Sequence, residues 1–350
     1  MVFMSAPAIP GISVPQLEEF IRAEIPDLLN GPLRVELLSG GRSNLTYRLT
    51  DGTTEWVLRR PPLGHVLATA HDMDREYRML RALHPTDVPV PAPLVIAGPE
   101  IIGAPFYIME FARGAVLRER EQLDRISAKS NDLAAGLVDT LARLHRLDPE
   151  AVGLGDLGRP QGYLERQLRR WDAQVAASHS RDLPDLVDLG ERLAAALPFG
   201  RAAALVHGDY RLDNVVVDPQ NARVVGVLDW EMATLGDPLT DLASMVIWWD
   251  GFRGLDSPVA AVPGDVPGFP TADTLVAQYA ELTGCDLSEF GWYLGFAYYK
   301  IAAIFEGIHY RTQQGLTVGD GFERLGAMVP ALIERGHTAF AEYVGPRPAH

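Results

Sequence analysis

The fold is decided by one stretch past the middle of the chain, residues 207–230, which reads HGDYRLDNVVVDPQNARVVGVLDW. Two short apolar runs, Val215–Val217 and Val224–Leu228, are separated by a segment that opens with Asp-Pro-Gln-Asn, a sequence typical of turns. This pattern predicts an antiparallel hairpin. Asn214 comes directly before the first strand and Asp229 directly after the second, so we expect both side chains at the open end of the hairpin.

Three of the oxygen-bearing side chains of this stretch are candidates for chemistry. The amide of Asn214 and the carboxylate of Asp229 offer the kind of oxygen ligands that Mg²⁺ prefers. Asp209 lies five residues before Asn214, in the loop that leads into the hairpin, where it can face the metal from the substrate side. Phosphoryl transfer needs little more than a metal that neutralises phosphate charge and a carboxylate that orients the attacking hydroxyl and accepts its proton. The spacing therefore indicates this chemistry.

The composition is that of a globular protein. At 350 residues, with 47% apolar and 22% charged residues, the chain has room for one large domain or two lobes. A net charge of −15 argues against binding to nucleic acid or to an anionic membrane, because both need basic surface. Cys285 is the single cysteine, which excludes an intrachain disulfide, and no stretch resembles a signal peptide or a membrane span. We expect a cytoplasmic monomer or homodimer.

The chain changes character near Gly114. Before it, the apolar pattern predicts a helix, a three-stranded meander, a second helix and two further strands, at 14–27, 33–60, 70–84, 94–97 and 106–111. After it, the clearest amphipathic or apolar helices are at 130–146, 161–178, 290–310 and 321–343. The run 251–272 is rich in glycine and proline and predicts a mobile surface loop, in the manner of a lid.

The stretch 207–230 resembles the catalytic loop of the aminoglycoside phosphotransferase and choline kinase family, which shares the protein-kinase fold. Its His-Gly-Asp-x-x-x-x-Asn stands where protein kinases have His-Arg-Asp-x-x-x-x-Asn, and Asp-Trp stands where they have Asp-Phe-Gly. The resemblance implies ATP and Mg²⁺ as cofactors. It also implies a bilobal α+β fold, with a small antiparallel-sheet N-lobe at 1–111 and a larger, mostly helical C-lobe at 112–350.

The same resemblance implies a role for each polar residue of the stretch. Asp209 corresponds to the catalytic base, and Asn214 and Asp229 correspond to the Mg²⁺ ligands. His207 and Asp241 correspond to residues that support the catalytic loop, Asp241 by bracing it from Asp-Pro-Leu-Thr-Asp at 237–241.

Two weaker resemblances lie in the N-lobe. One is to the phosphate-covering turn of the family, in the residues Ser39, Gly40, Gly41, Arg42, Ser43 and Asn44. This turn lacks the full Gly-x-Gly-x-x-Gly and also fits an ordinary hairpin turn. The other is to the hinge whose backbone holds the adenine, which implies Glu110 and Phe111, although a plain edge strand explains that segment equally well.

Glu76 matches the helix glutamate that pairs with a strand lysine in protein kinases. The chain has only two lysines, Lys129 and Lys300, and neither is near the N-terminus. Arg59 stands at the position of that lysine, as arginine does in choline kinases. Arginine keeps the charge and can grip both phosphate and Glu76, with a different reach.

The resemblance indicates a reaction but leaves the acceptor open. The sequence looks most like the branch made of kinase domains fused to some acyl-CoA dehydrogenases and their stand-alone bacterial relatives, which phosphorylate hydroxyacyl-CoA thioesters. Substrate residues in the family come mainly from the C-lobe, and the candidates here are Trp248, Lys300, Glu306 and Arg311. Lys300 and Arg311 suit an anionic CoA ester, whereas the net charge of −15 suits a polyamine. An aminoglycoside, or another small amino-alcohol or sugar, stays open as an alternative.

Other classes of protein fit the sequence less well. A nucleotide-binding regulator without turnover usually lacks one of Asp209, Asn214 and Asp229. A metal-dependent phosphoesterase generally uses Asp-x-His and Gly-Asn-His motifs, and neither occurs in the sequence. The sequence also has no Gly-Lys-Ser/Thr, which excludes a P-loop kinase, and no Gly-x-Ser-x-Gly, which disfavours a Ser-His hydrolase.

Overall fold

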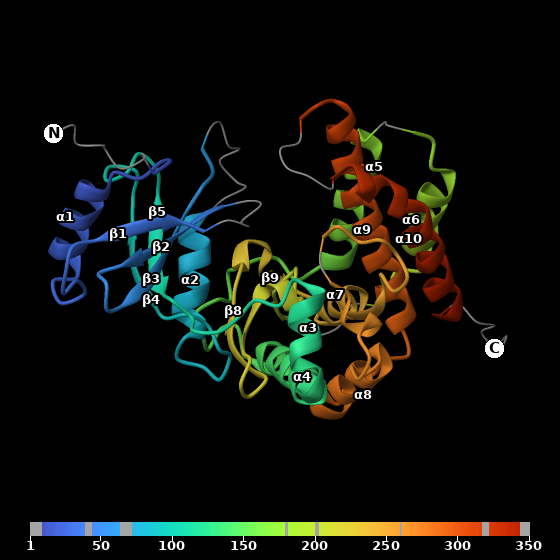
Figure 1. Cartoon of the computed structure of the whole chain (residues 1–350). Helices are drawn as coiled ribbons and strands as arrows, with labels where there is room; N and C mark the ends of the chain where they lie inside the picture. Colours follow the sequence, from blue (N-terminus) through green and yellow to red (C-terminus); the bar gives the residue numbers. More distant parts are fainter. Residues whose placement is uncertain are drawn as a thin grey trace. The chain divides into compact units, whose positions relative to one another are not determined.

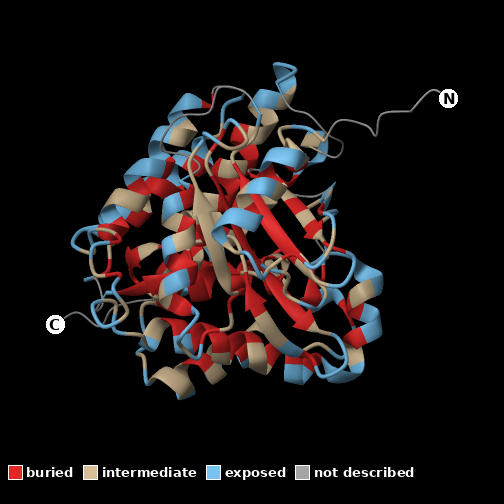
Figure 2. Cartoon of the chain, turned by 90° about the vertical axis from the view of Figure 1, so that its left-hand side faces the viewer, coloured by how far each residue is buried: buried red, intermediate tan, exposed pale blue. Residues whose placement is uncertain are grey.

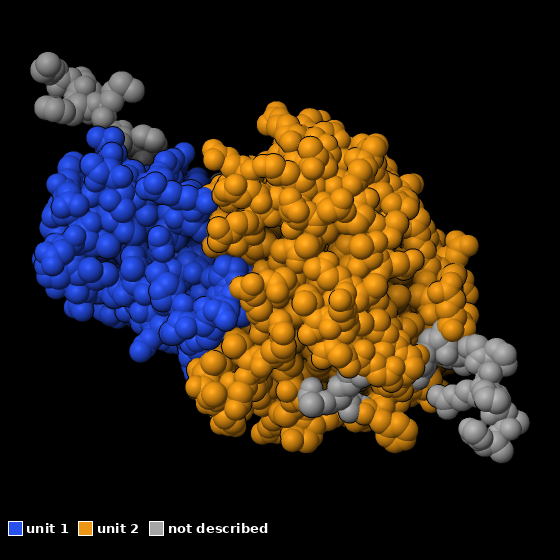
Figure 3. Space-filling model, turned by 90° about the horizontal axis from the view of Figure 1, so that it is seen from below, with its two compact units in different colours: residues 1–113, 226–231 blue, residues 114–225, 232–350 orange. Residues whose placement is uncertain are grey.

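The computed structural model describes residues 9–38, 44–63, 72–178, 181–199, 203–259, 261–316 and 322–343. The chain divides into two compact units (Figure 3). Unit 1 comprises residues 1–113 and 226–231, and unit 2 comprises residues 114–225 and 232–350. No helix in the described ranges is long and apolar enough to cross a membrane.

Unit 1 is built on a five-stranded antiparallel sheet (Figure 1). The strand order is β1-β2-β3-β5-β4, with bounds Arg34–Leu37 (β1), Leu45–Thr50 (β2), Glu55–Arg60 (β3), Pro93–Ala97 (β4) and Phe106–Glu110 (β5). The helices of this unit in the described ranges are Val14–Glu24 (α1) and Met73–Leu83 (α2).

One face of this sheet forms an apolar core with α1. Leu58 of β3 lies opposite Ile108 of β5 in that core, with Leu17 of α1. Because side chains alternate along a strand, the next pair in the register, Arg59 and Tyr107, lies on the other face. The alternation thus brings a buried arginine and a buried tyrosine together away from the apolar core.

Unit 2 is mostly helical (Figure 1). Its helices are Arg120–Ile126 (α3), Ser130–Arg146 (α4), Tyr163–Ala177 (α5), Pro184–Ala195 (α6), Leu239–Asp250 (α7), Ala272–Thr283 (α8), Phe290–Gln313 (α9) and Phe322–Tyr343 (α10). Strand β6 (Ala204–Val206) pairs antiparallel with β9 (Thr234–Gly236), and β7 (Val215–Asp218) pairs with β8 (Arg223–Val227). Helix α9 packs against α5, α6, α7 and α10.

The α+β organisation expected from the sequence is confirmed, and so is the hairpin, as β7 and β8. Helices α3, α6, α7 and α8 were not predicted. Helix α7 shows why: nearly all of its residues are buried, so it lacks the one-sided apolar pattern that reveals a surface helix. Figure 2 shows the more usual arrangement, in which buried and exposed residues alternate around the helices.

The run 251–271 is a loop in the part that the structure describes, with one short helical turn at Pro263–Asp265, but apolar contacts anchor it, and its mobility stays a prediction. Val262 and Val266 are buried, and the indole N–H of Trp249 donates a hydrogen bond of 2.9 Å to the carbonyl of Pro270. Apolar residues spaced between the glycines and prolines anchor this segment to unit 2. A count of glycine and proline alone does not reveal such anchors.

Candidate active site

The loop that follows β6 begins with a turn that requires glycine. Gly208 has a φ of +84°, in the left-handed region that residues with a Cβ rarely adopt. A Cβ at this position would also lie 2.7 Å from the carbonyl oxygen of Met232. The turn and the close approach therefore both depend on glycine, and they set the direction in which the chain enters Asp209.

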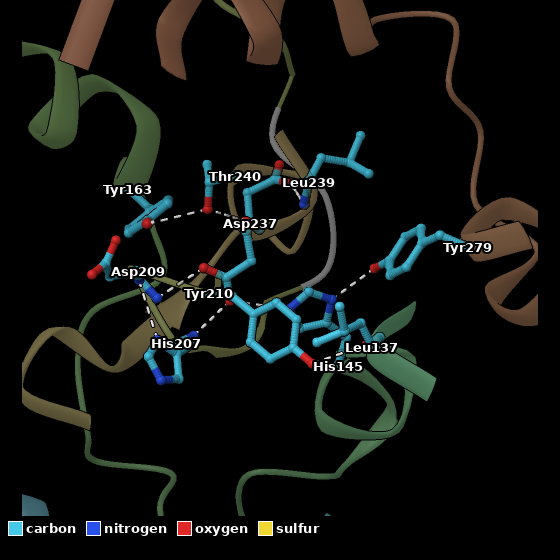
Figure 4. Close-up of polar contacts among 12 residues, drawn as sticks. Leu137, His145, Tyr163, His207, Asp209, Tyr210, Asp237, Leu239, Thr240 and Tyr279 are labelled. Atoms are coloured by element: carbon cyan, nitrogen blue, oxygen red, sulfur yellow. Dashed lines mark hydrogen bonds and ion pairs between the residues drawn. The ribbon is translucent and has the colours of Figure 1, made fainter. Parts of the chain in front are cut away.

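A buried carboxylate holds the start of this loop. Asp241, in the first turn of α7, is 1% exposed and accepts the backbone N–H of His207 at 2.6 Å and that of Gly208 at 2.8 Å. The ring of His145 lies 3.3 Å from the same carboxylate through Nε2 and 2.7 Å from the Tyr279 hydroxyl through Nδ1 (Figure 4). Burial acts to raise the pKa of Asp241, but the contacts with His145 and His207 outweigh it, so the pKa is lowered. Asp241 is therefore a carboxylate at neutral pH.

Two aromatic side chains fix the loop further (Figure 4). The hydroxyl of Tyr210 donates a hydrogen bond of 2.9 Å to the carbonyl of Leu137. The ring of His207 is fully buried, makes an edge contact with Tyr210, and accepts the backbone N–H of Asp209 at 3.3 Å. Through these contacts the His207 ring touches both Tyr210 and the backbone of Asp209, as a residue that supports the loop would. The supporting role of His207 stays a prediction.

Asn214 holds the carboxylate of Asp209 in place. Its Nδ2 donates to the carbonyl oxygen of Asp209 at 2.8 Å and to Oδ2 of Asp209 at 2.9 Å. The amide nitrogen is thereby used, and the amide oxygen is the atom that remains for a metal ion. The side chain of Asp209 keeps 32% of its surface exposed, so a substrate can reach it.

Arg211 is a residue of this loop that was not predicted. Its Nε lies 3.3 Å from Oδ2 of Asp209, and its Nη1 lies 3.3 Å from Oδ2 of Asp213. Its guanidinium group lies over the ring of Trp248, 4.2 Å from the ring centroid. Arg211 therefore places a fixed positive charge beside Asp209. An arginine two residues after the proposed base was a signal in the sequence that could have identified it.

Unit 1 carries a second polar cluster, on the face of the sheet that bears Arg59. The carboxylate of Glu76 is 1% exposed and accepts hydrogen bonds of 2.8 Å from Nδ2 of Asn44 and from the hydroxyl of Tyr107. Arg59 Nε lies 3.4 Å from Glu76 Oε2, and Arg59 Nη2 lies 3.1 Å from Asp229 Oδ1. The arginine–glutamate pair that we expected in place of a lysine–glutamate pair is thus formed. Tyr107 was missed, because its position opposite Arg59 follows only once β3 and β5 are known to pair.

Burial and charge act against each other in this cluster. Burial raises the pKa of Glu76 in spite of the nearby Arg59 charge, and it raises the pKa of Tyr107 well above its usual value. Burial acts to lower the pKa of Arg59, but its neighbours, Tyr107, Glu76 and Asp229, outweigh it and raise that pKa. Arg59 is therefore a permanent cation on this face of the sheet.

The donor set suits Mg²⁺. Asp229 has a φ of +65°, a strained conformation for a residue with a side chain and one that often occurs at functional sites. Its carboxylate is 31% exposed. No group of three or more His, Cys, Asp and Glu residues that could hold a metal exists in the described ranges. Magnesium needs no such group, because it is usually held by one or two protein oxygens together with phosphates and water. Asp229 of unit 1 and Asn214 of unit 2 each carry an oxygen of this kind, and their role as Mg²⁺ ligands stays a prediction.

A pocket adjoins Asp209 within unit 2. Its cavity volume is about 50 Å³, it opens to solvent, and its lining includes Asp209, Trp248, Phe296, Lys300, Ile301 and Ile304. Lys300 Nζ donates a hydrogen bond of 2.8 Å to the carbonyl of Gly208. Burial lowers the pKa of Lys300, while the charges of Asp209 and Asp241 oppose that change. Two of the predicted substrate residues, Trp248 and Lys300, thus lie at this pocket.

The other two predicted substrate residues do not line it. Glu306 is 1% exposed, and its carboxylate is paired with Arg181, with a shortest contact of 2.7 Å. It lies six residues beyond Lys300 on α9, about a third of a turn away around the helix, and because it is buried and paired, its prediction as a substrate residue is corrected to a structural ion pair. Arg311 is exposed and lies about 16 Å beyond Lys300 along the helix.

Part of the predicted nucleotide site is not described. Ser39, Gly40, Gly41, Arg42 and Ser43 lie outside the described residues. In the predicted hinge, the backbone N–H of Glu110 already donates to the carbonyl of Ala92 at 2.8 Å, so this N–H is not left for adenine. The ring of Phe111 contacts the guanidinium of Arg48. The hinge roles of both residues stay predictions.

Known proteins share this architecture. A model of the phosphotransferase enzyme family matches residues 34–271, more than half of the chain. A solved protein of Ralstonia eutropha that is assigned to the aminoglycoside phosphotransferases is 31% identical, with a TM-score of 0.81 over 94% of this chain and 98% of that one. An aminoglycoside phosphotransferase solved with GDP and kanamycin is 17% identical, with a TM-score of 0.58 over 92% of this chain and 98% of that one, which shows the shared fold alone.

A curated relative is longer than this chain. Acyl-CoA dehydrogenase family member 11 of Gallus gallus is 34% identical over 314 residues, which are 87% of this chain and 40% of that protein. The chain therefore spans well under half of that relative. The bilobal, protein-kinase-like fold that the sequence implied is confirmed by these matches. The chain belongs to the phosphotransferase enzyme family, and these matches support a small-molecule kinase that acts on hydroxyl groups.

Proposed function

We propose that this chain transfers the terminal phosphate of ATP, with Mg²⁺, to the hydroxyl group of a hydroxyacyl-CoA. The observation that carries the proposal is the way Asp209 is held. Its loop is fixed through Asp241 and its carboxylate through Asn214, yet that carboxylate remains partly exposed at the pocket. A carboxylate that is immobilised and still accessible suits a general base better than a structural aspartate does.

In the proposed reaction, the acceptor oxygen bonds to the γ-phosphorus of ATP while the bond to the β–γ bridging oxygen breaks and ADP leaves. Asp209 orients the acceptor hydroxyl and takes up its proton. When bound by Asn214 and Asp229, Mg²⁺ supplies charge neutralisation on the phosphates. Arg59, held between Glu76 and Asp229, offers a permanent positive charge for the nucleotide phosphates.

Two observations support a hydroxyacyl-CoA as the acceptor. The curated relative is an acyl-CoA dehydrogenase family member, and this chain matches a part of it that makes up 40% of its length. In addition, the pocket beside Asp209 combines apolar side chains with the ammonium group of Lys300, which suits a hydrocarbon chain with an oxygen-bearing group. A pocket with an apolar lining is not expected for an acceptor that consists only of sugar rings.

An aminoglycoside, or another small amino-alcohol or sugar, is the alternative acceptor. The solved relative of Ralstonia eutropha, assigned to the aminoglycoside phosphotransferases, favours it. A nucleotide-binding regulator without turnover is a further alternative. The intact set of Asp209, Asn214 and Asp229 counts against the regulator.

The test is ADP release with ATP and Mg²⁺ across hydroxyacyl-CoAs, aminoglycosides, choline and simple sugars. We expect acceptor-dependent turnover that is confined to hydroxyacyl-CoAs and lowered about 10²- to 10⁴-fold in Asp209→Asn. Asp218→Asn, which removes an exposed carboxylate from the turn of the same hairpin, is the matched control and should keep the rate. Turnover of aminoglycosides alone would select the alternative acceptor. Nucleotide binding without turnover of any acceptor would select the regulator.

A further inference from the structure

The pocket beside Asp209 contains a cation, although the protein as a whole is acidic. The chain carries a net charge of −15, yet Lys300 lines this pocket, and the guanidinium groups of Arg211 and Arg170 are close enough to act on the Lys300 pKa. The carboxylates in its lining are Asp209 and Asp241. Both carboxylate oxygens of Asp241 accept hydrogen bonds from the backbone of the loop. Asp209 is therefore the carboxylate of the lining that can contact a ligand.

Lys300 has hydrogen-bonding capacity to spare. An ammonium group has three donors, and the described contacts give Nζ of Lys300 one acceptor, the carbonyl of Gly208 at 2.8 Å. Its other neighbour is the ring of Trp171, whose centroid lies 5.7 Å from Nζ. A ligand oxygen that entered the pocket would meet the ammonium group of Lys300, whose hydrogen-bond partner Gly208 directly precedes the proposed base, Asp209.

The residues around Lys300 on α9 are apolar. Phe296 and Ile304 lie one helical turn before and after it, on the same side of the helix, and both line the pocket. Ile301 lies beside them in the same lining. Along this side of α9, the ammonium group of Lys300 therefore lies between two apolar side chains.

We propose that Lys300 is the specificity-determining residue of the acceptor pocket. It donates to a carbonyl or carboxylate oxygen of the acceptor, while Phe296, Ile301 and Ile304 contact the acceptor's hydrocarbon chain. The same ammonium group repels acceptors that carry an amine near the reacting hydroxyl. The pocket therefore selects hydroxyacyl compounds and disfavours amino-alcohols and aminoglycosides. This inference rests on the proposed function, since it requires that Asp209 is the base for the transfer.

The test must separate acceptor selection from bracing of the loop, because Lys300 also binds the carbonyl of Gly208. The measured quantity is the ratio of kcat/KM for a hydroxyacyl thioester to kcat/KM for an amino-alcohol of equal chain length. Loss of a charge-assisted hydrogen bond in Lys300→Met should lower this ratio roughly 10- to 100-fold, mainly through KM of the thioester. Lys300→Arg should keep most of the preference, because it keeps the charge. Lys129→Met removes the other lysine of the chain, which is exposed on unit 2, and should leave the ratio unchanged.

A second variant tests the apolar side of the pocket without touching the loop. Ile304→Ala should move the preference toward acyl chains that are longer by one or two carbons, and this measurement remains decisive if Lys300→Met does not fold. A ratio that is equal in wild type and Lys300→Met, or a chain-length preference that is unchanged in Ile304→Ala, would overturn the inference while the kinase assignment stands. If the wild-type protein phosphorylates no acceptor, the proposed function itself is wrong, and the inference on Lys300 fails with it.

Discussion

Asp241→Asn is the perturbation whose effect can be worked out most fully from the structure. The carboxylate accepts two backbone hydrogen bonds, from His207 at 2.6 Å and from Gly208 at 2.8 Å. An asparagine has one acceptor oxygen, so one of these N–H groups would face an amide NH₂ donor instead. Loss of one hydrogen bond to a charged group costs about 1.5–3 kcal/mol, and a buried donor without a partner costs a further 1–3 kcal/mol or so. We expect a loss of about 3–5 kcal/mol in unfolding free energy.

The pH dependence gives this prediction a second measurable feature. The pKa of Asp241 is lowered in the folded protein, so its stabilisation is fully present above the usual aspartate range and is lost as the pH falls through the folded-state pKa. The difference in stability between wild type and Asp241→Asn should therefore be constant near neutral pH and should shrink in acid. Thermal unfolding at a series of pH values measures it, and kcat for ADP release should fall at least about tenfold, because the loop that carries Asp209 is loosened.

Asp237→Asn is the matched control for this experiment. Asp237 lies four residues earlier, before the start of α7, and its carboxylate accepts hydrogen bonds from the backbone N–H of Leu239 and the hydroxyl of Tyr293. It should cost stability with a smaller fall in kcat. Equal stability of wild type and Asp241→Asn at neutral pH, or equal falls in kcat for the two variants, would refute the bracing role of Asp241.

Three further predictions concern other parts of the molecule. Arg59→Lys should raise KM for ATP about tenfold, because a single ammonium group cannot contact Glu76 and Asp229 together as the guanidinium nitrogens of Arg59 do. Titration of nucleotide binding measures this, and an unchanged KM would contradict a role for Arg59 in holding the nucleotide. Gly208→Ala should lower the unfolding free energy by about 1–3 kcal/mol and reduce kcat, since φ is +84° there, and a variant with wild-type stability would contradict the turn. Glu306→Gln should lower stability by about 1.5–3 kcal/mol while KM for the acceptor stays unchanged, and a raised KM would restore Glu306 as a substrate residue.

The sequence predicted the site best where its residues are neighbours in the chain. The hairpin and the loop before it follow from a local pattern of turn residues and valines between Asp209 and Asp229, and the structure contains them as β7 and β8. The pairing of Arg59 with Glu76 was predicted through family resemblance, and it too is present.

The contacts that were missed join residues far apart in the sequence. The hydrogen bond from Lys300 to Gly208 spans 92 positions, and no periodicity or motif marks it. Tyr107 was missed because its contact with Glu76 depends on the strand register, which the hydrophobic pattern fixes only after the sheet order is known. Glu306 was misassigned because a polar residue on a mostly apolar helix can equally form a buried ion pair, and its partner Arg181 lies on another segment.

The most direct test of the central claim is to measure the phosphorylated acceptor itself, by ³¹P NMR of reactions that contain ATP, Mg²⁺ and a hydroxyacyl-CoA. We predict that wild type forms a phosphate monoester in equal amount to ADP. In Asp209→Asn the rate should fall about 10²- to 10⁴-fold while nucleotide binding is retained. Formation of the ester by Asp209→Asn at the wild-type rate would contradict the assignment of Asp209 as the base. Release of ADP with inorganic phosphate alone would contradict phosphoryl transfer to this acceptor.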